Sequence, residues 1–187
     1  MRHSLFIFSG REGTSSVTMD RETFLAVVED SYSAYYTIQR NEDLTELPLA
    51  FRADYFSRDE KYWFTKNVKI WGNETNEFCY VFCAPHFDAD TVERCLDFVI
   101  EDALPRVKPH KEHQYTNFKA VFLADSYDEA AKQAVKKRKY TKNYKHSLHG
   151  YSMLLTAAVD LSDCSTVTNK AGYPLVKYFR KLFDARK

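Results

Sequence analysis

The sequence predicts an α+β domain, with a mixed or antiparallel β-sheet and helices packed on the sheet. Three observations predict this class. Short runs that alternate or are wholly apolar indicate strands, amphipathic runs with helical spacing lie between them, and Gly and Pro number only five each. A length of 187 residues with 44% hydrophobic residues is typical of one domain with a real core. The predicted order of elements is α-β-β-β-α-β-α-β-(β)-α.

The start of the chain is expected to hold an arm and then a helix. Residues 9–18 are rich in Ser, Thr and Gly, so we predict a flexible N-terminal arm over 1–18 and a single α+β domain over 19–187. Asp20 is a candidate N-cap, and apolar or aromatic residues recur with helical spacing from Phe24 to Ile38. The spacing predicts a helix over this stretch.

Three strands are predicted next, over residues 49–55, 62–71 and 78–84. The polar segments 57–60 and 72–76 would be the connections between them, and such short connections favour an antiparallel meander. The third run is apolar at every position, which is typical of a strand buried on both faces.

The second half of the chain alternates helices with strands. Asp88 or Asp90 is a candidate cap for a helix whose apolar stripe runs from Val92 to Ala103, and Pro105 ends it. The remaining elements are a fourth strand over 118–124, a helix opened by a capping box of Ser126 and Glu129, a strand over 147–161, a short strand over 166–168 that pairs back onto it, and a helix over 175–183.

Cysteine usage and hydropathy predict a soluble cytoplasmic protein without a membrane partner. The four cysteines, at 79, 83, 95 and 164, form no C-x-x-C pair, and the first three lie in apolar patterns, as reduced cysteines do. The apolar stretch Leu5–Phe8 is too short for a signal peptide or a membrane span. Glycine-rich phosphate loops and a G-x-S-x-G motif are absent from the sequence, and we predict no cofactor.

The strongest functional signal is a local concentration of positive charge. The chain has a net charge of +1, yet residues 136–145 hold six cations and two tyrosines, and the loop 106–114 holds three further cations and two histidines. The first loop precedes the fourth strand and the second follows the next helix, so we expect both at one end of the sheet. Cations bind phosphates and tyrosine rings stack on bases. The alternative is a solvated helix end, where lysines are favoured by the helix dipole.

The leading hypothesis is therefore a non-enzymatic binding or accessory protein whose basic surface meets nucleic acid or another polyanion. The predicted binding residues are Arg106, Lys108, His110, Lys136, Lys137, Arg138, Lys139, Tyr140, Lys142 and Tyr144. A third hypothesis, after the nuclease considered below, is a homodimer or a protein-interaction module that uses the aromatic residues, which make up 16% of the chain.

Histidines and carboxylates suggest two kinds of metal site. His110 and His113 are transition-metal ligands by type, but their spacing is not H-E-x-x-H, and solvated loop histidines are the alternative. The order α-β-β-β-α-β also matches the core of restriction-endonuclease-like nucleases, which hold a metal with an Asp on one strand and an (Asp/Glu)-x-Lys motif on the next. The corresponding hydrolase set here is Asp54, Asp59, Glu60 and Lys61.

That nuclease pattern is imperfect in this sequence. The segment Asp59-Glu60-Lys61 lies one strand too early, and the third strand begins Glu77-Phe78-Cys79, with Cys where the motif has Lys.

Several segments resemble a bacterial protein family of unknown function. They are Glu60-Lys61-Tyr62, Val68-Lys69-Ile70-Trp71, Arg106-Val107-Lys108-Pro109-His110, Ala124-Asp125-Ser126, Ser147-Leu148-His149-Gly150 and Thr156-Ala157-Ala158-Val159-Asp160. The resemblance spans roughly residues 20–182. It implies a small bacterial cytosolic protein and transfers no catalytic residue.

Overall fold

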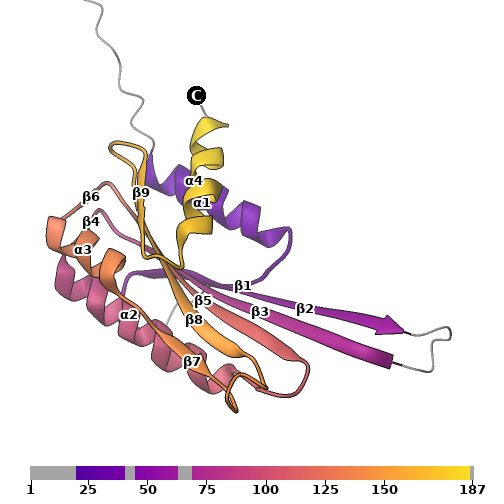
Figure 1. Ribbon diagram of the computed structural model, residues 1–187. Helices are drawn as coiled ribbons and strands as arrows, with labels where there is room; N and C mark the ends of the chain where they lie inside the picture. Colours follow the sequence, from indigo (N-terminus) through magenta and orange to yellow (C-terminus); the bar gives the residue numbers. More distant parts are fainter. Residues whose placement is uncertain (1–19, 41–44, 63–68, 186–187) are drawn as a thin grey trace, which may run out of the picture.

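The computed structural model describes residues 20–40, 45–62 and 69–185, with the side chains of residues 59–72 outside the description. Within these ranges the chain forms a seven-stranded mixed sheet with helices on both faces (Figure 1), so the predicted α+β class is confirmed. The predicted arm over 1–18 lies outside the described residues.

The sheet has the strand order β1-β2-β3-β5-β8-β7, with β9 also paired to β8. The first three strands are antiparallel, β3, β5 and β8 are parallel, and β7 and β9 run antiparallel to β8. The bounds are β1 Thr37–Arg40, β2 Leu49–Tyr62, β3 Lys69–Cys83, β5 His113–Ala124, β7 Thr141–Asn143, β8 Tyr151–Asp160 and β9 Ser165–Thr168, and a separate parallel pair is formed by β4 His86–Phe87 and β6 Ser126–Tyr127.

Four helices cover this sheet: α1 Arg21–Ser33, α2 Ala89–Ala103, α3 Glu129–Lys137 and α4 Tyr173–Asp184, with a short 3-10 turn η1 at Leu104–Arg106. Two predicted caps are confirmed, because Asp20 accepts the backbone N–H of Thr23 at 2.9 Å and Asp88 accepts that of Thr91 at 2.7 Å. The prediction of a capping box at α3 is wrong. The N-cap is Asp128, and the Ser126 hydroxyl instead contacts Nδ1 of His86 at 2.9 Å.

The predicted first helix is too long at its C-terminal end. Helix α1 ends at Ser33, and the backbone N–H groups of Tyr35 and Tyr36 both bond to the carbonyl of Tyr32, at 3.0 and 2.9 Å. Ile38 belongs to β1, where it pairs with Ala53. Aromatic and β-branched residues favour strands, so residues 35–38 leave the helix although their spacing continues its apolar stripe.

The antiparallel meander exists, but its strands differ from the predicted ones. The segments 57–60 and 72–76 are not connections: Ser57 pairs with Thr75 and Asp59 with Asn73 in one long β2–β3 ladder. The three antiparallel strands are β1, β2 and β3, and the outer half of β2 and β3 projects beyond the other strands as a two-stranded ribbon (Figure 1). Polar residues are tolerated there because no helix of the described residues lies over the ribbon (Figure 1).

The predicted strand over 147–161 is also shorter in the structure. Lys145, His146 and Ser147 have φ of 48°, 53° and 69°, a left-handed conformation that no strand uses, and β8 begins only at Tyr151. The short strand that pairs back onto β8 and the final helix are confirmed as β9 and α4.

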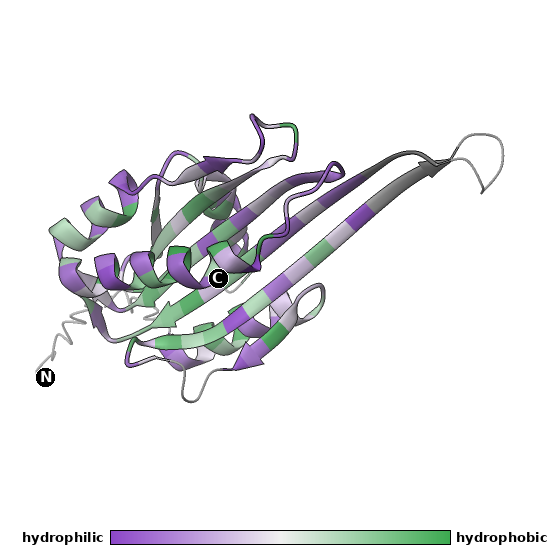
Figure 2. Cartoon of the chain, turned by 90° about the horizontal axis from the view of Figure 1, so that it is seen from below, coloured by the Kyte–Doolittle hydropathy of each residue, from purple (hydrophilic) through white to green (hydrophobic). Residues whose placement is uncertain are grey.

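Two separate cores lie on the two faces of the sheet. The β3 run from Phe78 to Phe82 is buried at every position, as predicted. Its even-numbered residues pack with α2 and α3 around Phe122, and its odd-numbered residues pack with α1 and α4 around Phe179. In Figure 2 the strand segments between the helices are largely green, the colour of hydrophobic residues. The result is a sheet with a helical layer on each face.

Candidate functional site

The loop before β5 and the hairpin in which the second basic run ends meet at one end of the sheet, whereas residues 136–139 of that run lie farther along the sheet edge, beside Thr156 of β8. Because β5 and β8 are parallel, the loop before β5 and the hairpin before β8 emerge at the same end. The buried His113 ring joins them: its Nδ1 lies 2.8 Å from the carbonyl of His149, and its Nε2 lies 2.8 Å from the Thr116 hydroxyl. Burial and the charge of Lys145 hold the pKa of His149 below its usual value.

A glycine makes this close approach possible. Gly150 has φ of +73°, and a Cβ there would lie 2.4 Å from the carbonyl oxygen of Gln114. Any other residue would therefore push the hairpin away from the start of β5.

Seven lysines lie on the loop before β5, at the end of α3, and on β7 and the segments that flank it, β7 being the last strand in the sheet order. We call them the lysine edge: Lys108, Lys111, Lys136, Lys137, Lys139, Lys142 and Lys145. All seven are exposed, and none forms an ion pair with a residue that the structure describes. Three of the lysines follow or end α3, beside a groove of about 620 Å³ against α2 that Lys137 and Lys139 line.

The two arginines of the predicted set are instead engaged with carboxylates. Arg138 donates to Glu93 at 2.9 Å and also contacts Asp97, both on α2. Arg106 is half-buried, with its guanidinium 4.1 Å above the Phe78 ring and an ion pair to Asp54. These contacts hold α3 and η1 in place.

The predicted tyrosines lie at the lysine edge with their rings turned toward the protein. Tyr140 packs on Phe118 with ring centroids 6.0 Å apart. The Tyr144 hydroxyl lies 2.9 Å from that of Ser152, and its ring sits against His113. His110 also lies here, with Nε2 at 3.1 Å from Glu74 and Nδ1 accepting the backbone N–H of Glu112 at 3.2 Å.

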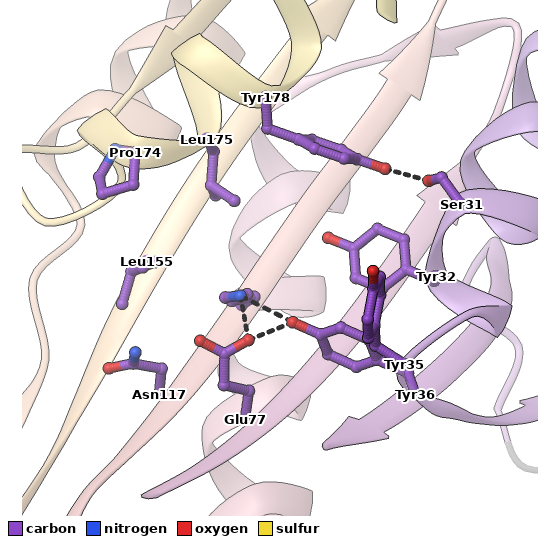
Figure 3. A pocket seen from close by; sticks show the side chains of 11 residues that line it. Ser31, Tyr32, Tyr35, Tyr36, Glu77, Asn117, Leu155, Pro174, Leu175 and Tyr178 are labelled. Carbon is purple, nitrogen blue, oxygen red and sulfur yellow. Dashed lines mark hydrogen bonds and ion pairs between the residues drawn. The ribbon is translucent and has the colours of Figure 1, made fainter. Parts of the chain in front are cut away.

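A second candidate site was not foreseen from the sequence. It is a cleft of about 420 Å³ on the opposite helical layer, between α1, α4 and the sheet, and we call it the tyrosine cleft (Figure 3). Its walls are mostly aromatic and apolar. The lining residues are Ser31, Tyr32, Tyr35, Tyr36, Glu77, Asn117, Lys119, Leu155, Pro174, Leu175 and Tyr178.

The floor of the tyrosine cleft is a half-buried ion pair. Lys119 of β5 and Glu77 of β3 have side chains only 12% and 19% exposed, and they bind each other directly. The Tyr36 hydroxyl donates to the same Glu77 oxygen, and the Lys119 ammonium donates to the Tyr36 oxygen at 3.1 Å. A lysine within an otherwise apolar strand was the sequence signal that could have identified this site.

The pKa values of three titratable groups in the cleft lie farther from neutral pH than their usual values. The Lys119 charge, with hydrogen bonds from Lys119, Tyr36 and Asn117, outweighs burial and lowers the pKa of Glu77. Burial and the contact with Glu77 raise the pKa of Tyr36 well above 10. Burial raises the pKa of Tyr178 to about 12. General acids and bases need pKa values near the working pH, so these groups suit binding better than proton transfer.

Residues 20–181 match a family described as "Domain of unknown function (DUF8052)". The chain belongs to this family. This match confirms the expectation from the sequence that the chain resembles a family of unknown function. No curated protein and no solved structure gives a significant match to the chain.

The described residues of this DUF8052 chain hold no group of three or more His, Cys, Asp or Glu side chains arranged to bind a metal. Both ring nitrogens of His110 and of His113 already have hydrogen-bond partners in the protein. Within the same described ranges, no helix has the length and apolar character needed to cross a membrane.

The nuclease-like residues of the DUF8052 chain are only partly described. The side chains of Asp59, Glu60 and Lys61 lie outside the described residues. Asp54 pairs with Phe78 in the ladder and faces α2, whereas Glu77 pairs with Tyr55 and faces the tyrosine cleft. Asp54 and Glu77 are therefore on opposite faces of the sheet, and Asp54 is bound to Arg106.

Proposed function

We propose that the protein is a binding or accessory protein that holds a polyanion, nucleic acid first among them, along the lysine edge. The observation that carries the proposal is the set of seven exposed lysines without ion pairs to described residues, on the loop before β5, on the hairpin at the same end of the sheet, and on the edge segment that leads from α3 to β7. In a chain with net charge +1, this concentration gives a strong local potential.

The geometry favours contacts to phosphates over contacts to bases. The rings of Tyr140 and Tyr144 pack against Phe118 and His113 of the protein, which leaves less ring surface for stacking on bases. The lysine ammonium groups, in contrast, lie on exposed side chains from Lys136 to Lys145. We therefore expect binding with little sequence preference, which is the behaviour of phosphate-directed proteins.

The hairpin conformation supports the same proposal. Lys145, His146 and Ser147 are three consecutive left-handed residues that are not glycine, and all three side chains are exposed. Such conformations cost energy and persist where the surrounding structure enforces them, often at functional surfaces.

The test is fluorescence anisotropy with labelled single- and double-stranded DNA and RNA across a salt series, with and without magnesium. We expect the logarithm of the affinity to fall linearly with the logarithm of the salt concentration, with a slope of about −0.9 per phosphate contact on duplex DNA. The variant Lys136→Gln/Lys137→Gln/Lys139→Gln should lose at least about tenfold in affinity and flatten the slope. Absence of binding at low salt contradicts the proposal.

A charge-matched control separates the lysine edge from general attraction. Lys170, Lys177 and Lys181 are also exposed, but they lie in and just before α4, on the other helical layer. Changing these three to Gln removes the same charge and should leave the affinity nearly unchanged. Equal losses in the two triple variants would show that only net charge matters.

Two alternative functions are a nuclease and a homodimer. The same assay tests the nuclease. Strand cleavage that requires magnesium would favour the hydrolase based on Asp54, Asp59, Glu60 and Lys61. A homodimer is expected to use a contiguous apolar surface. The exposed large hydrophobic residues in the described part, Tyr35, Phe56, Leu148 and Tyr173, come from four separate elements.

We further propose that this binding takes place in a bacterial cytoplasm. All four cysteines are free, and Cys79 and Cys95 are buried in the cores. Burial raises the pKa of Cys79 to about 11 and that of Cys95 to about 12, so their thiols stay protonated and unreactive. This supports the expectation of a reducing compartment. Localisation of a tagged chain in a bacterial host is the direct test.

A further inference from the structure

The tyrosine cleft has the dimensions and composition of a small-molecule site. Its volume of about 420 Å³ lies within the range of ligand pockets, and its walls are apolar except for one polar patch on the floor. Tyr178 of α4, Tyr32 of α1 and Tyr36 after α1 gather on one side of the cleft, and Pro174 and Leu155 lie on the other (Figure 3). A flat molecule would find aromatic surface on one side and aliphatic surface on the other.

The walls are held rigidly, which favours binding over collapse. Tyr32 packs edge-on against Tyr36 with centroids 4.8 Å apart, and against Tyr178 at 5.8 Å. The Tyr178 hydroxyl bonds to the Ser31 hydroxyl, which itself donates to the carbonyl of Val28 at 2.8 Å. Helices α1 and α4 are thus fastened to each other above the cleft.

The floor carries no net charge but offers one donor. Glu77 receives hydrogen bonds from Tyr36 and Lys119, so its charge is balanced within the cleft. The Lys119 ammonium has three N–H groups and uses two of them on described residues, Glu77 and the Tyr36 oxygen. The remaining N–H can bond to an acceptor on a ligand.

We propose that the tyrosine cleft binds a small, planar, uncharged aromatic molecule that places a hydrogen-bond acceptor, such as an amide carbonyl, on Lys119. The rings of Tyr35, Tyr36 and Tyr178 contact its faces and edges. An anionic ligand that accepts from Lys119 also lies beside the like charge of Glu77, and a cationic ligand that approaches Glu77 also lies beside Lys119, while a neutral acceptor faces no like charge. This site is independent of the lysine edge.

Three compounds with one ring system test the charge preference: 2-naphthamide, 2-naphthoate and 2-naphthylmethylammonium. Each is titrated into the full-length protein labelled with nitrogen-15, and backbone amide shifts are followed by NMR. We expect saturable shifts at Ser31, Tyr36 and Asn117, with 2-naphthamide binding at least about fivefold more tightly than either ion, as one ordinary hydrogen bond without a repulsive charge would give. Equal affinities, or shifts confined to other residues, overturn the proposal.

Two exposed tyrosines provide a matched pair of variants for the cleft walls. Tyr35 lines the cleft and is 78% exposed, whereas Tyr173, at the start of α4, is 74% exposed and does not line it. Neither change to Ala removes a buried side chain. Tyr35→Ala should weaken 2-naphthamide binding by about 2–10-fold, the worth of one aromatic contact, and Tyr173→Ala should have no effect. Equal effects overturn the assignment.

The role of Lys119 needs a variant that keeps the floor neutral. Lys119→Met alone would leave Glu77 without its cation, so the change is combined with Glu77→Gln. Thermal unfolding first confirms that the double variant folds. We expect its preference for 2-naphthamide over the two ions to disappear. A preference that survives in the folded double variant overturns the assignment of Lys119, and if this variant does not fold, the Tyr35→Ala and Tyr173→Ala pair decides.

Discussion

The two faces of the sheet carry similar polar networks with different surroundings. On the α1/α4 face, Tyr36, Glu77 and Lys119 form what we call the lysine network, and it is open to the tyrosine cleft. On the α2 face, Asp54, Tyr80, Asp102 and Arg106 form the arginine network, where Arg106 donates to the Tyr80 hydroxyl at 3.1 Å. Each has a tyrosine hydroxyl, at least one carboxylate and a cation that reaches both, and on the α2 face Arg52 also pairs with Asp102 at 3.0 Å.

The difference between the two networks follows from the cation. The planar guanidinium of Arg106 reaches Asp54, Tyr80 and Asp102 and also covers the Phe78 ring, so both of its terminal nitrogens and one of its faces are engaged within the protein. The ammonium of Lys119 is a point charge on a flexible stem, and it bonds to two partners at the floor of a cavity. Arg106 is therefore engaged within the protein on its face of the sheet, whereas Lys119 keeps one N–H donor for a ligand in the tyrosine cleft.

The largest expected effect is on the arginine network. Arg106→Met leaves Asp54, which is only 8% exposed, without its ion pair, while Asp102 keeps Arg52 at 3.0 Å, so we expect a loss of about 3 kcal/mol in unfolding free energy. Urea unfolding measures this. Arg138→Met is the control, because its partners Glu93 and Asp97 are about half exposed and the loss should stay below about 1 kcal/mol. Equal losses of unfolding free energy in the two variants would mean that Arg106 does not hold a buried network together.

A smaller loss is expected in the lysine network. Glu77→Gln keeps the shape of the side chain and removes the charge that balances Lys119, whose side chain is 12% exposed. We expect a loss of about 1–3 kcal/mol in urea unfolding. Glu93→Gln, at a carboxylate 46% exposed, should change the free energy of unfolding by less than half as much. A neutral result for Glu77→Gln would show that water already screens the ion pair.

Removing one hydroxyl should have a lesser effect again. Tyr36→Phe deletes the donor to Glu77 and the acceptor for Lys119 while keeping the ring, and we expect a loss of about 1 kcal/mol. Tyr173→Phe is the control, since that tyrosine is 74% exposed, and no change is expected. Thermal or urea unfolding of the two variants side by side measures the difference.

The smallest and most specific effect is a pH dependence of opposite sign in the two networks. The pKa of Glu77 is lowered, so its contribution to stability is present above its unfolded pKa of about 4.3 and is lost as pH falls through the folded value. Burial raises the pKa of Asp54 despite Arg106, and its Oδ1 has no hydrogen-bond partner. Its contribution is present below an unfolded pKa of about 3.9 and is lost as pH rises through the folded value.

Urea unfolding between pH 6 and pH 3 distinguishes the two carboxylates. Glu77→Gln should lose less stability than the wild-type protein on acidification, because the group that is protonated is gone. Asp54→Asn should lose more, because the compensating gain from Asp54 is gone. If both variants shift the acid limb in the same direction, the two networks are electrostatically alike.

The sequence predicted the helices and the buried strands well, because their apolar periodicity reports directly on burial. Helix α2 was predicted from its apolar stripe, a candidate cap at Asp88 or Asp90 and the stop at Pro105, and the structure has it over Ala89–Ala103 with Asp88 as the cap. The strand pairing of the ribbon was not predicted, because residues 57–60 and 72–76 are polar and resemble turns. These residues form strands because the two segments pair with each other, and a local sequence pattern does not show which distant residues pair.

The candidate sites show the same limit. The convergence of the loop before β5 and the hairpin before β8 followed from the order of elements, since parallel strands place equivalent loops at one end. The engagement of Arg106 by Asp54, 52 residues away, did not, because it depends on η1 turning that side chain onto β2 and β3. The tyrosine cleft joins residues from five distant segments, and no motif marks it.

The projecting ribbon should also leave a distinctive record in amide hydrogen exchange. Beyond Asp54, β2 has no described neighbour except β3, and β3 before Glu74 has none except β2. Alternate backbone N–H groups there point to solvent, so deuterium uptake should rise and fall with every second residue. Strand β5, paired on both sides, should be protected at consecutive positions. A strand added to either ribbon edge would be detected as the loss of that alternation on one strand.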